Sequence, residues 1–409
     1  MMSKDNKDLV VGLDIGTSKV AALVAQLLPD GRMELRGLGC HESIGLKKGV
    51  VVNIDATVDT ISRVIQEVEL MADCKVDEVY TGIAGSHIRS FNSHGMVAIK
   101  DREVTLADVQ RVMEVARAMP IPADQQILHV LEQEFIIDGQ DGVRDPIGMS
   151  GARLEVKVHI VTGAVSAAQN IVKCVRRCGL EVADLILQPI ASSRAVLSED
   201  ECDLGVCLVD IGGGTTDIAI FTQGAIRHTA VIPIAGDQIT NDIAMALRTP
   251  TQDAEDIKLR HGLTLADQAD KDDRFDVPGI GDRPPRQLSR QALADVIQPR
   301  VSELFELVQS ELRRSGYEEL LSSGVVLCGG SSVMPGMVEL AEEIFHLPVR
   351  IGAPRYRGNI ADVVQHPRHA TGMGLLLEAA AQRRRGEARQ TRNMQQVWGR
   401  MRAWFERNF

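Results

Sequence analysis

The motif Asp-Ile-Gly occurs twice in this chain of 409 residues, each time at the end of an apolar run rich in β-branched residues. The first copy, Asp14-Ile15-Gly16, follows a run from Val10, and the second, Asp210-Ile211-Gly212, follows a run from Leu204. A new apolar run begins shortly after each copy, so each predicts a strand, a tight turn and a second strand. The copies lie 196 residues apart. Because the chain is more than twice the ~150 residues typical of one domain, this repeat predicts two related lobes.

The residues between the two copies predict an insert in the first lobe. Thr105 and Asp108 are typical of a helix cap, and apolar residues follow at helical spacing as far as Ala116. From Leu154 to Ile160, apolar and polar residues alternate, which predicts a strand with one buried face. We therefore expect a small α+β insert of residues 84–165, flanked by first-lobe segments of residues 1–83 and 166–203.

The second lobe is expected to have a core of residues 204–245 and 321–381. Val325 to Cys328 form a short apolar run that predicts a buried strand, and helical patterning begins again near Met337. Between the two core segments, residues 246–320 predict a subdomain with a polar loop over 267–290 and a helix from about residue 293 to 312. The Arg-rich residues 382–392 predict a solvated linker.

Three Gly-rich turns beside predicted strand ends lie in Asp14 to Lys19, Asp210 to Asp217 and Cys328 to Ser332. They indicate phosphate binding, because glycine lets several backbone N–H groups approach one anion. The first two turns add a carboxylate, Asp14 or Asp210, and hydroxyl groups. This combination suits Mg²⁺ held mostly through water between protein and phosphate oxygens. A plain β-hairpin would explain any one turn, but a hairpin needs neither the carboxylate nor the hydroxyls at both copies. The chain lacks the P-loop motif, and no G-x-G-x-x-G opens a helix after a strand as in a Rossmann site.

In this order, the three turns resemble the phosphate-1, phosphate-2 and adenosine motifs of the actin-like ATPase superfamily, which includes actin, MreB, sugar kinases and large heat-shock chaperones. Within that superfamily, the chain resembles the FtsA family of bacterial cell-division proteins. The resemblance covers nearly the whole chain and includes the segments Gly82 to Ile88, Gly236 to Ala244 and Ala254 to Lys258. It implies an α/β actin-like fold, in which two lobes of related mixed sheets, flanked by helices, surround a nucleotide cleft.

The resemblance implies a site for ATP and Mg²⁺. Asp14 and Asp210 would orient the hydration shell of the ion, and Asp217 is either a third carboxylate of that shell or a hydrogen-bonding residue at a strand edge. The phosphates would be held by Gly16, Thr17, Ser18, Lys19, Gly212, Gly213, Gly214 and Thr215. The nucleoside and the α-phosphate would be held by Gly236, Asp237, Glu255, Lys258, Gly329, Gly330 and Ser331. The pair Glu255 and Lys258 has the alternative of an exposed ion pair on a helix.

The family pattern also implies a residue that positions the attacking water. Gln188, which precedes Pro189 and a helix rich in small residues, matches the place of the Glu or Gln that has this role in the superfamily. A neutral amide can orient water but is a poor general base. We therefore expect ATP binding with slow turnover at most, and the class of enzyme is left open.

The C-terminal segment differs from the rest of the chain in charge and composition. Residues 381–409 hold eight Arg and two Glu, so this segment has a net charge of +6. Since the net charge of the whole chain is −11, the remaining residues carry −17. Both tryptophans of the chain, Trp398 and Trp404, lie within its last twelve residues. The acidic body disfavours nucleic acid as a partner. The N-terminal residues lack the apolar stretch of a signal peptide, and no run of about twenty apolar residues predicts a membrane span.

Residues 393–409 predict an amphipathic helix whose apolar side chains fall within an arc of about 140°. As a helix, the sixteen residues 394–409 would span about 24 Å, which is too short to cross a ~30 Å hydrocarbon layer comfortably, so we expect this helix to lie on anionic lipid. The alternative is docking on the body or on a protein groove. The expected membrane-binding residues are Met394, Val397, Trp398, Arg400, Met401, Arg402, Trp404, Phe405, Arg407 and Phe409.

The resemblance implies an ATP-binding protein that polymerises on the cytoplasmic face of the bacterial inner membrane at the division site. Its expected partners are FtsZ, which it would tether to the membrane, later division proteins, anionic lipid and further copies of itself. By family analogy, residues 246–320 would contact FtsZ. Two alternatives remain at this point, a small-molecule kinase of the sugar-kinase type and an actin-like ATPase of pilus assembly.

Overall fold

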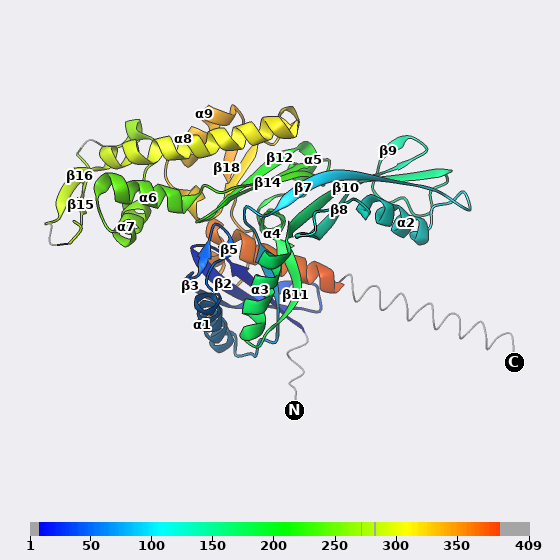
Figure 1. Cartoon of the computed structure of the whole chain (residues 1–409), viewed down its shortest axis with the longest axis horizontal. Coiled ribbons are helices and arrows are strands. Elements are labelled where there is room, and N and C mark those ends of the chain that lie inside the picture. Colours follow the sequence, from blue (N-terminus) through cyan, green and yellow to red (C-terminus); the bar gives the residue numbers. More distant parts are fainter. Residues whose placement is uncertain (1–7, 271, 282–283, 385–409) are drawn as a thin grey trace.

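The computed structural model of the protein describes residues 8–270, 272–281 and 284–384, and two five-stranded sheets form its centre (Figure 1). The first-lobe sheet has the order β11-β6-β1-β2-β3, and the second-lobe sheet has the order β14-β13-β12-β17-β18. In the first sheet the strands are β1 (Leu9–Ile15), β2 (Lys19–Leu27), β3 (Met33–Glu42), β6 (Glu78–Ile83) and β11 (Glu181–Leu187). In the second they are β12 (Val206–Ile211), β13 (Thr216–Thr222), β14 (Ala225–Ile232), β17 (Val325–Cys328) and β18 (Val349–Ile351).

The two sheets have the same topology. In each, three consecutive strands pair antiparallel, and two later strands join parallel on the far side of the first one. The predicted strand, turn and strand around both Asp-Ile-Gly copies is thus confirmed, and with it the prediction of two related lobes of mixed sheets. The second copy differs in one detail, because its strand begins at Val206, and Leu204 ends the short helix α5 (Glu199–Leu204).

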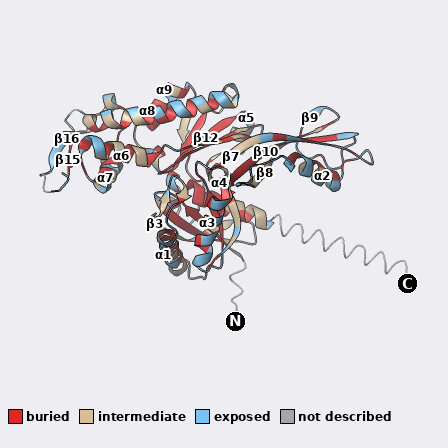
Figure 2. Ribbon diagram, in the orientation of Figure 1, coloured by how far each residue is buried: buried red, intermediate tan, exposed pale blue. Residues whose placement is uncertain are grey.

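Both faces of each sheet are buried, which explains the nearly continuous apolar runs in the sequence (Figure 2). Helices α1 (Ile54–Ala72) and α3 (Val165–Arg177) cover the outer face of the first sheet. The outer face of the second is covered by α6 (Gly236–Leu247), α8 (Arg290–Ser315) and α9 (Met337–Phe345).

Two helices lie between the sheets and share one core with the inner faces of both. They are α4 (Gln188–Val196) and a helix over residues 370–384, which follows α10 (Ala361–Val364) and a 3-10 turn, Pro367–His369. This core contains Leu23 of the first sheet and Leu208 of the second, both fully buried. The two lobes are therefore joined by packing as well as by the chain.

The insert is a four-stranded sheet of order β7-β10-β8-β9 with one helix against it. Thr105 caps that helix as predicted, because its hydroxyl accepts from the Asp108 N–H while the Asp108 carboxylate accepts from the Thr105 N–H. The elements are β7 (Arg89–Ala98), α2 (Leu106–Arg117), β8 (Gln125–Ile137), β9 (Gln140–Val143) and β10 (Arg153–Ala164).

The prediction of one buried face for the strand over 154–160 was wrong. Glu155 and His159 are buried on the face that was expected to be polar and exposed. For His159 the reason is tertiary, because this end of β10 lies against β14 of the second lobe, whereas Glu155 is paired within the insert with His94 and Arg153. His159 contacts the Thr229 hydroxyl of β14 at 3.0 Å through Nε2.

The subdomain between the second-lobe core segments holds α7 (Thr251–His261) and α8, which extends past both ends of the helix predicted over 293–312. The polar stretch predicted as a loop instead contains a hairpin, β15 (Arg274–Val277) with β16 (Arg286–Ser289), which gains stability because Phe275 and Val277 are buried. The remaining short elements are β4 (Leu46–Lys47), β5 (Val50–Val51), and 3-10 turns at Ala266–Gln268, Glu318–Leu320 and Gly330–Val333.

The last described helix continues to residue 384, past the predicted fold end at Ala381. Gln382, expected in the linker, donates from Nε2 to Asp184 Oδ2 at 2.7 Å. The predicted amphipathic segment 393–409 lies outside the described residues. Among the described helices, none combines the length and the apolar character needed to cross a membrane.

Candidate functional site

The two repeated turns face each other at one edge of the two sheets. The Gly16 N–H donates to the Lys19 carbonyl at 2.9 Å, and in the second copy the Gly212 N–H donates to the Thr215 carbonyl at 3.0 Å. A Cβ on Gly214 would lie only 2.6 Å from the Thr17 hydroxyl. Glycine is therefore required where the turn of one lobe approaches that of the other.

A cavity of about 420 Å³ lies between these turns and the Gly-rich segment that follows β17. It brings together nearly all of the residues proposed for the site from the sequence, from both lobes. The exception is Gly236, which lies behind the lining, where a Cβ would meet the Ser331 hydroxyl at 2.5 Å. The predicted residues on the lining are Asp14, Gly16, Thr17, Ser18, Lys19, Gln188, Asp210, Gly212, Gly213, Gly214, Thr215, Asp217, Asp237, Glu255, Lys258, Gly329, Gly330 and Ser331.

Strand alternation places three carboxylates on the inner faces of the two sheets. Asp14 lies on the face of β1 that carries Val10, and Asp210 on the face of β12 that carries Leu208. Asp217 is the cross-strand partner of Asp210. Burial raises the pKa of the Asp210 carboxyl. Burial and the adjacent charge of Asp210 together raise the pKa of Asp217 to about 8.

Asp217 has an incomplete set of partners. The Thr215 hydroxyl donates to its Oδ2 at 3.0 Å, whereas its buried Oδ1 has no hydrogen-bond partner. A buried carboxylate oxygen without a partner is unfavourable. Asp217 also lines the cavity, so this carboxyl group lies next to the space that a ligand would occupy.

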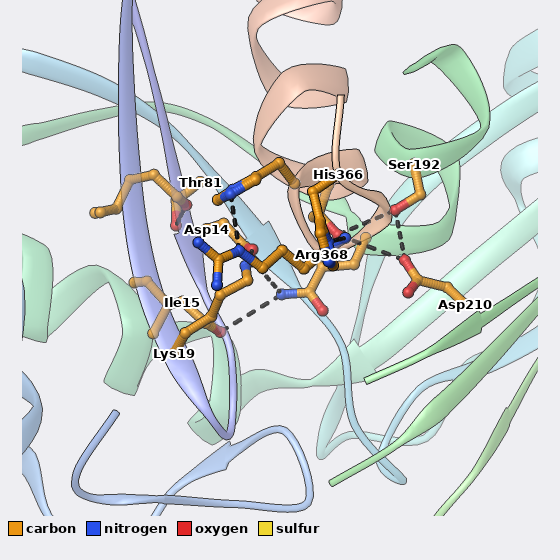
Figure 3. A network of polar contacts seen from close by, with 12 residues as sticks. Asp14, Ile15, Lys19, Thr81, Ser192, Asp210, His366 and Arg368 are labelled. Atoms are coloured by element: carbon orange, nitrogen blue, oxygen red, sulfur yellow. Dashed lines mark hydrogen bonds and ion pairs between the residues drawn. The ribbon is translucent and has the colours of Figure 1, made fainter. Parts of the chain in front are cut away.

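The first-lobe side of the cavity carries an ion pair and an amide (Figure 3). Lys19 Nζ lies 2.5 Å from Asp14 Oδ2. Gln188, at the start of α4, points its Nε2 toward Asp14 Oδ1 at 3.4 Å. The side chain proposed to position water thus lies next to a carboxylate proposed to orient the ion.

The second-lobe side of the cavity holds a buried lysine. Lys258 Nζ donates to the Gly236 carbonyl at 3.2 Å and lies 2.7 Å from Glu255 Oε2. The alternative of an exposed ion pair is wrong for Lys258, which is only 8% exposed. Beside it the lining is largely apolar, with Leu259, Val333, Met334 and Pro335. This side therefore offers an apolar wall with a few polar groups, as small-molecule sites commonly do.

Sequence reasoning missed several residues of the site. Gly49, His366, Arg368 and Thr371 also line the cavity. Arg368 donates from Nε to the buried His369 at 2.9 Å. Burial, with the charges of Lys19 and Arg368, lowers the pKa of His369 to about 3, so this ring is neutral. No motif marks the segment 366–371, because it enters the site only through the packing of the last helix.

Among the described residues, no group of three or more His, Cys, Asp or Glu side chains is arranged to hold a metal ion directly. The ten residues predicted to bind lipid, from Met394 to Phe409, lie outside the described part of the chain.

Solved structures with a similar fold come from the actin-like ATPases. The PilM-PilN type IV pilus biogenesis complex matches with a TM-score of 0.66 at 18% identity, over 91% of this chain and 98% of that one. MreB5 of Spiroplasma citri bound to ADP matches with a TM-score of 0.55 at 16% identity, over 90% of this chain and 95% of that one. These similarities establish the actin-like fold.

Sequence comparison identifies the family. The model "Cell division protein FtsA" matches residues 207–374, and "SHS2 domain inserted in FTSA" matches residues 85–162, which is the insert in the first lobe. Proteins described as cell division protein FtsA are similar over nearly the whole chain. That of Pseudomonas aeruginosa is 63% identical over 92% of this chain and 90% of its own length. That of Neisseria meningitidis is 50% identical over 97% of this chain and 98% of its own length. That of Escherichia coli K12 is 45% identical over the full length of both chains. With such relatives over more than nine-tenths of its length, the chain belongs to the FtsA family of cell-division proteins.

Proposed function

We propose that this protein binds ATP with Mg²⁺ in the cavity between its lobes, polymerises on the inner membrane, and tethers FtsZ filaments there through its C-terminal segment. The observation that carries the nucleotide part is the pair of matching Gly turns, one from each lobe, that face each other across a cavity lined by buried carboxylates. The relative MreB5 of Spiroplasma citri, which shares the fold, is described as bound to ADP.

The residues present fit a nucleotide phosphate chain. Backbone N–H groups of the turns at Gly16 and Gly212 can donate to phosphate oxygens without an intervening side chain, and Lys19 adds a positive charge. The apolar wall that includes Met334 suits the base of a nucleotide. Lys258 and Glu255 would form hydrogen bonds with the hydroxyl groups of its ribose. A ligand that contacts both turns stabilises the arrangement in which the lobes face each other. This gives nucleotide a means to set the subunit shape for filament assembly.

The residues also fit a hydrated cation. Since no described cluster holds a metal directly, the ligands of Mg²⁺ would come mainly from phosphate and water, as is usual for this ion. Asp14, Asp210 and Asp217, which all line the cavity, would accept hydrogen bonds from that water. When bound, Mg²⁺ would neutralise phosphate charge. Gln188 would orient water but cannot efficiently accept a proton, so we expect slow hydrolysis.

The membrane and partner functions rest on the sequence of the C-terminal segment and on family membership. Seven apolar side chains at ~1–2 kcal/mol each would be nearly offset by the ordering of about sixteen residues. One tail would therefore bind anionic lipid weakly, whereas tails linked in a filament would bind with a high effective concentration. We assign FtsZ binding to residues 246–320 and contacts with later division proteins to the insert. Family membership favours this role at the division site over the sugar-kinase and pilus-assembly alternatives.

Co-sedimentation of the full chain with anionic vesicles, with and without Mg²⁺-ATP and FtsZ, tests the proposal. We expect Mg²⁺-ATP to increase pelleting and FtsZ to pellet only with this protein.

Two variants separate the membrane anchor from the nucleotide site. Trp404→Glu should keep ATP binding and lose vesicle binding. Gly330→Val should lose ATP binding without losing the fold, because the nearest atom to a Cβ there, on Arg368, is 3.6 Å away. Equal pelleting of Trp404→Glu would contradict the anchor, and undiminished ATP binding by Gly330→Val would contradict the site.

A further inference from the structure

A chain of hydroxyl groups links the helices between the sheets to Asp210. The Ser192 hydroxyl of α4 donates to Asp210 Oδ2 at 2.6 Å, and Ser192 Oγ lies 3.0 Å from Thr371 Oγ1 in the last helix (Figure 3). All three residues are at least nine-tenths buried. Ser192 and Thr371 are 179 residues apart in the sequence, so only the packing of the two helices brings them together.

The direction of these hydrogen bonds follows from the number of protons. Ser192 has one hydroxyl proton, and the short contact with the carboxylate uses it. Thr371 therefore donates its own proton, either to Ser192 Oγ at 3.0 Å or to Asp210 Oδ2 at 3.5 Å, and in both cases away from the cavity. Both Thr371 and Asp210 line the cavity, whereas Ser192 does not. The oxygen of Thr371 and the carboxylate of Asp210 are thus left facing the cavity as hydrogen-bond acceptors, which is the surface that a hydrated cation requires.

The other oxygen of Asp210 is also restricted. A Cβ on Gly329, whose φ of +85° already favours glycine, would lie 2.5 Å from Asp210 Oδ1. The carboxylate is therefore placed by the Gly329 backbone on one side and by the Ser192 hydroxyl on the other. Without Ser192, the only hydroxyl within reach of Oδ2 among the described residues is that of Thr371 at 3.5 Å.

We propose that Ser192 and Thr371 are positioning residues that hold Asp210 in the orientation needed to bind the water shell of Mg²⁺. This inference rests on the nucleotide site proposed above. Because Asp210 belongs to the second-lobe sheet and its two supports belong to the helices between the lobes, the same contacts make cation binding depend on how the lobes are packed. Partners of this indirect kind commonly account for 10- to 100-fold in metal affinity.

Titrations of ATP into the full-length protein, with Mg²⁺ and with EDTA, test the proposal through the ratio of the two affinities. For Ser192→Ala and Thr371→Val we expect that ratio to fall about tenfold or more, while metal-free ATP binding changes little. Thr371→Ser retains the hydroxyl and should restore the ratio. Ser193→Ala is the matched control, because Ser193 is also buried on α4 but donates only to the Ile190 carbonyl.

The outcomes separate this inference from the proposed function. If the unaltered protein binds no ATP, the nucleotide site itself is refuted. If it binds ATP with Mg²⁺ but the variants keep the same ratio, the positioning role is refuted. A parallel loss of binding with and without Mg²⁺, together with a lower melting temperature, would show that the hydroxyls only support packing. Thr371→Val, which preserves side-chain shape, keeps the test valid if Ser192→Ala does not fold.

Discussion

Glu201 shows how one residue can both cap its own helix and join it to a distant strand. Its carboxylate accepts from the Ser198 N–H at 2.8 Å at the start of α5, and from Arg350 of β18 through Nε at 2.7 Å and Nη2 at 2.8 Å. Burial opposes ionisation of this carboxyl, but hydrogen bonds from Arg350 and Ser198 outweigh it and lower the pKa to about 2. Charge-assisted contacts of this bidentate form are among the stronger ones in proteins.

Because the pKa of Glu201 is lower in the folded state, its stabilisation is present above pH 4.5 and is lost as pH falls toward 2. After allowance for partial exposure, we expect Glu201→Gln to reduce the free energy of unfolding by on the order of 2 kcal/mol at pH 7 and by less at pH 3.5. Urea unfolding at both pH values checks this. Glu199→Gln, at an exposed position on the same helix, should have little effect, and a pH-independent loss would contradict the assignment.

At the scale of elements, α2 begins where the sequence predicts because its cap is local. Thr105 and Asp108 satisfy each other's backbone N–H groups within four residues of chain. Thr105→Ala should reduce the free energy of unfolding by about 1 kcal/mol. Thr105→Ser, which keeps the hydroxyl group, should preserve most of the stabilisation that the cap provides. Hydrogen exchange of the amides of residues 106–109 provides a second measurement. Unchanged exchange in Thr105→Ala would show that the packing of Val112 and Ala116, rather than the cap, holds the helix end.

At the scale of the whole molecule, the insert is attached by chain to the first lobe but hydrogen-bonds to the second. Gln133 Nε2 donates to the Ile226 carbonyl at 2.9 Å, Asn92 Nδ2 to the Arg227 carbonyl at 3.3 Å, and the Ser90 hydroxyl to the Thr229 carbonyl at 2.9 Å. Side chains of the insert thus satisfy backbone acceptors of β14. This seam gives the lobes a second connection, in addition to the helices between the sheets.

Loss of the seam should be measurable in the whole chain. Asn92→Ala combined with Gln133→Ala leaves carbonyl groups of Ile226 and Arg227 without these donors, and we expect a loss of about 2 kcal/mol in urea unfolding. Faster hydrogen exchange of residues 226–232 should accompany it. Lys157→Ala on the same insert removes an ion pair with Glu134 in which the lysine side chain is half-exposed, and it should cost less than about 1 kcal/mol. If the two changes reduced the free energy of unfolding equally, the contacts between the insert and β14 would have no special stabilising role.

Local patterns in the chain are enough to predict those parts of this protein that depend on neighbouring residues. Apolar runs rich in β-branched residues, together with turn chemistry, sufficed to predict both Asp-Ile-Gly hairpins, and resemblance of the turns to a family added the fold and most residues that line the cavity. The structure places them there because Asp14 and Asp210 end strands of equivalent register in two matching sheets.

Features that depend on helix packing and on contacts between the lobes could not be predicted from local patterns. Ser192, Arg368 and Thr371 have no local signature, since their roles follow from two helices between the sheets. The burial of His159, and the hairpin within the polar stretch 267–290, likewise arise from surfaces supplied by distant segments. The spacing of apolar residues and the turn residues indicate the local conformation of a segment, whereas the burial of that segment depends on which other segment packs against it.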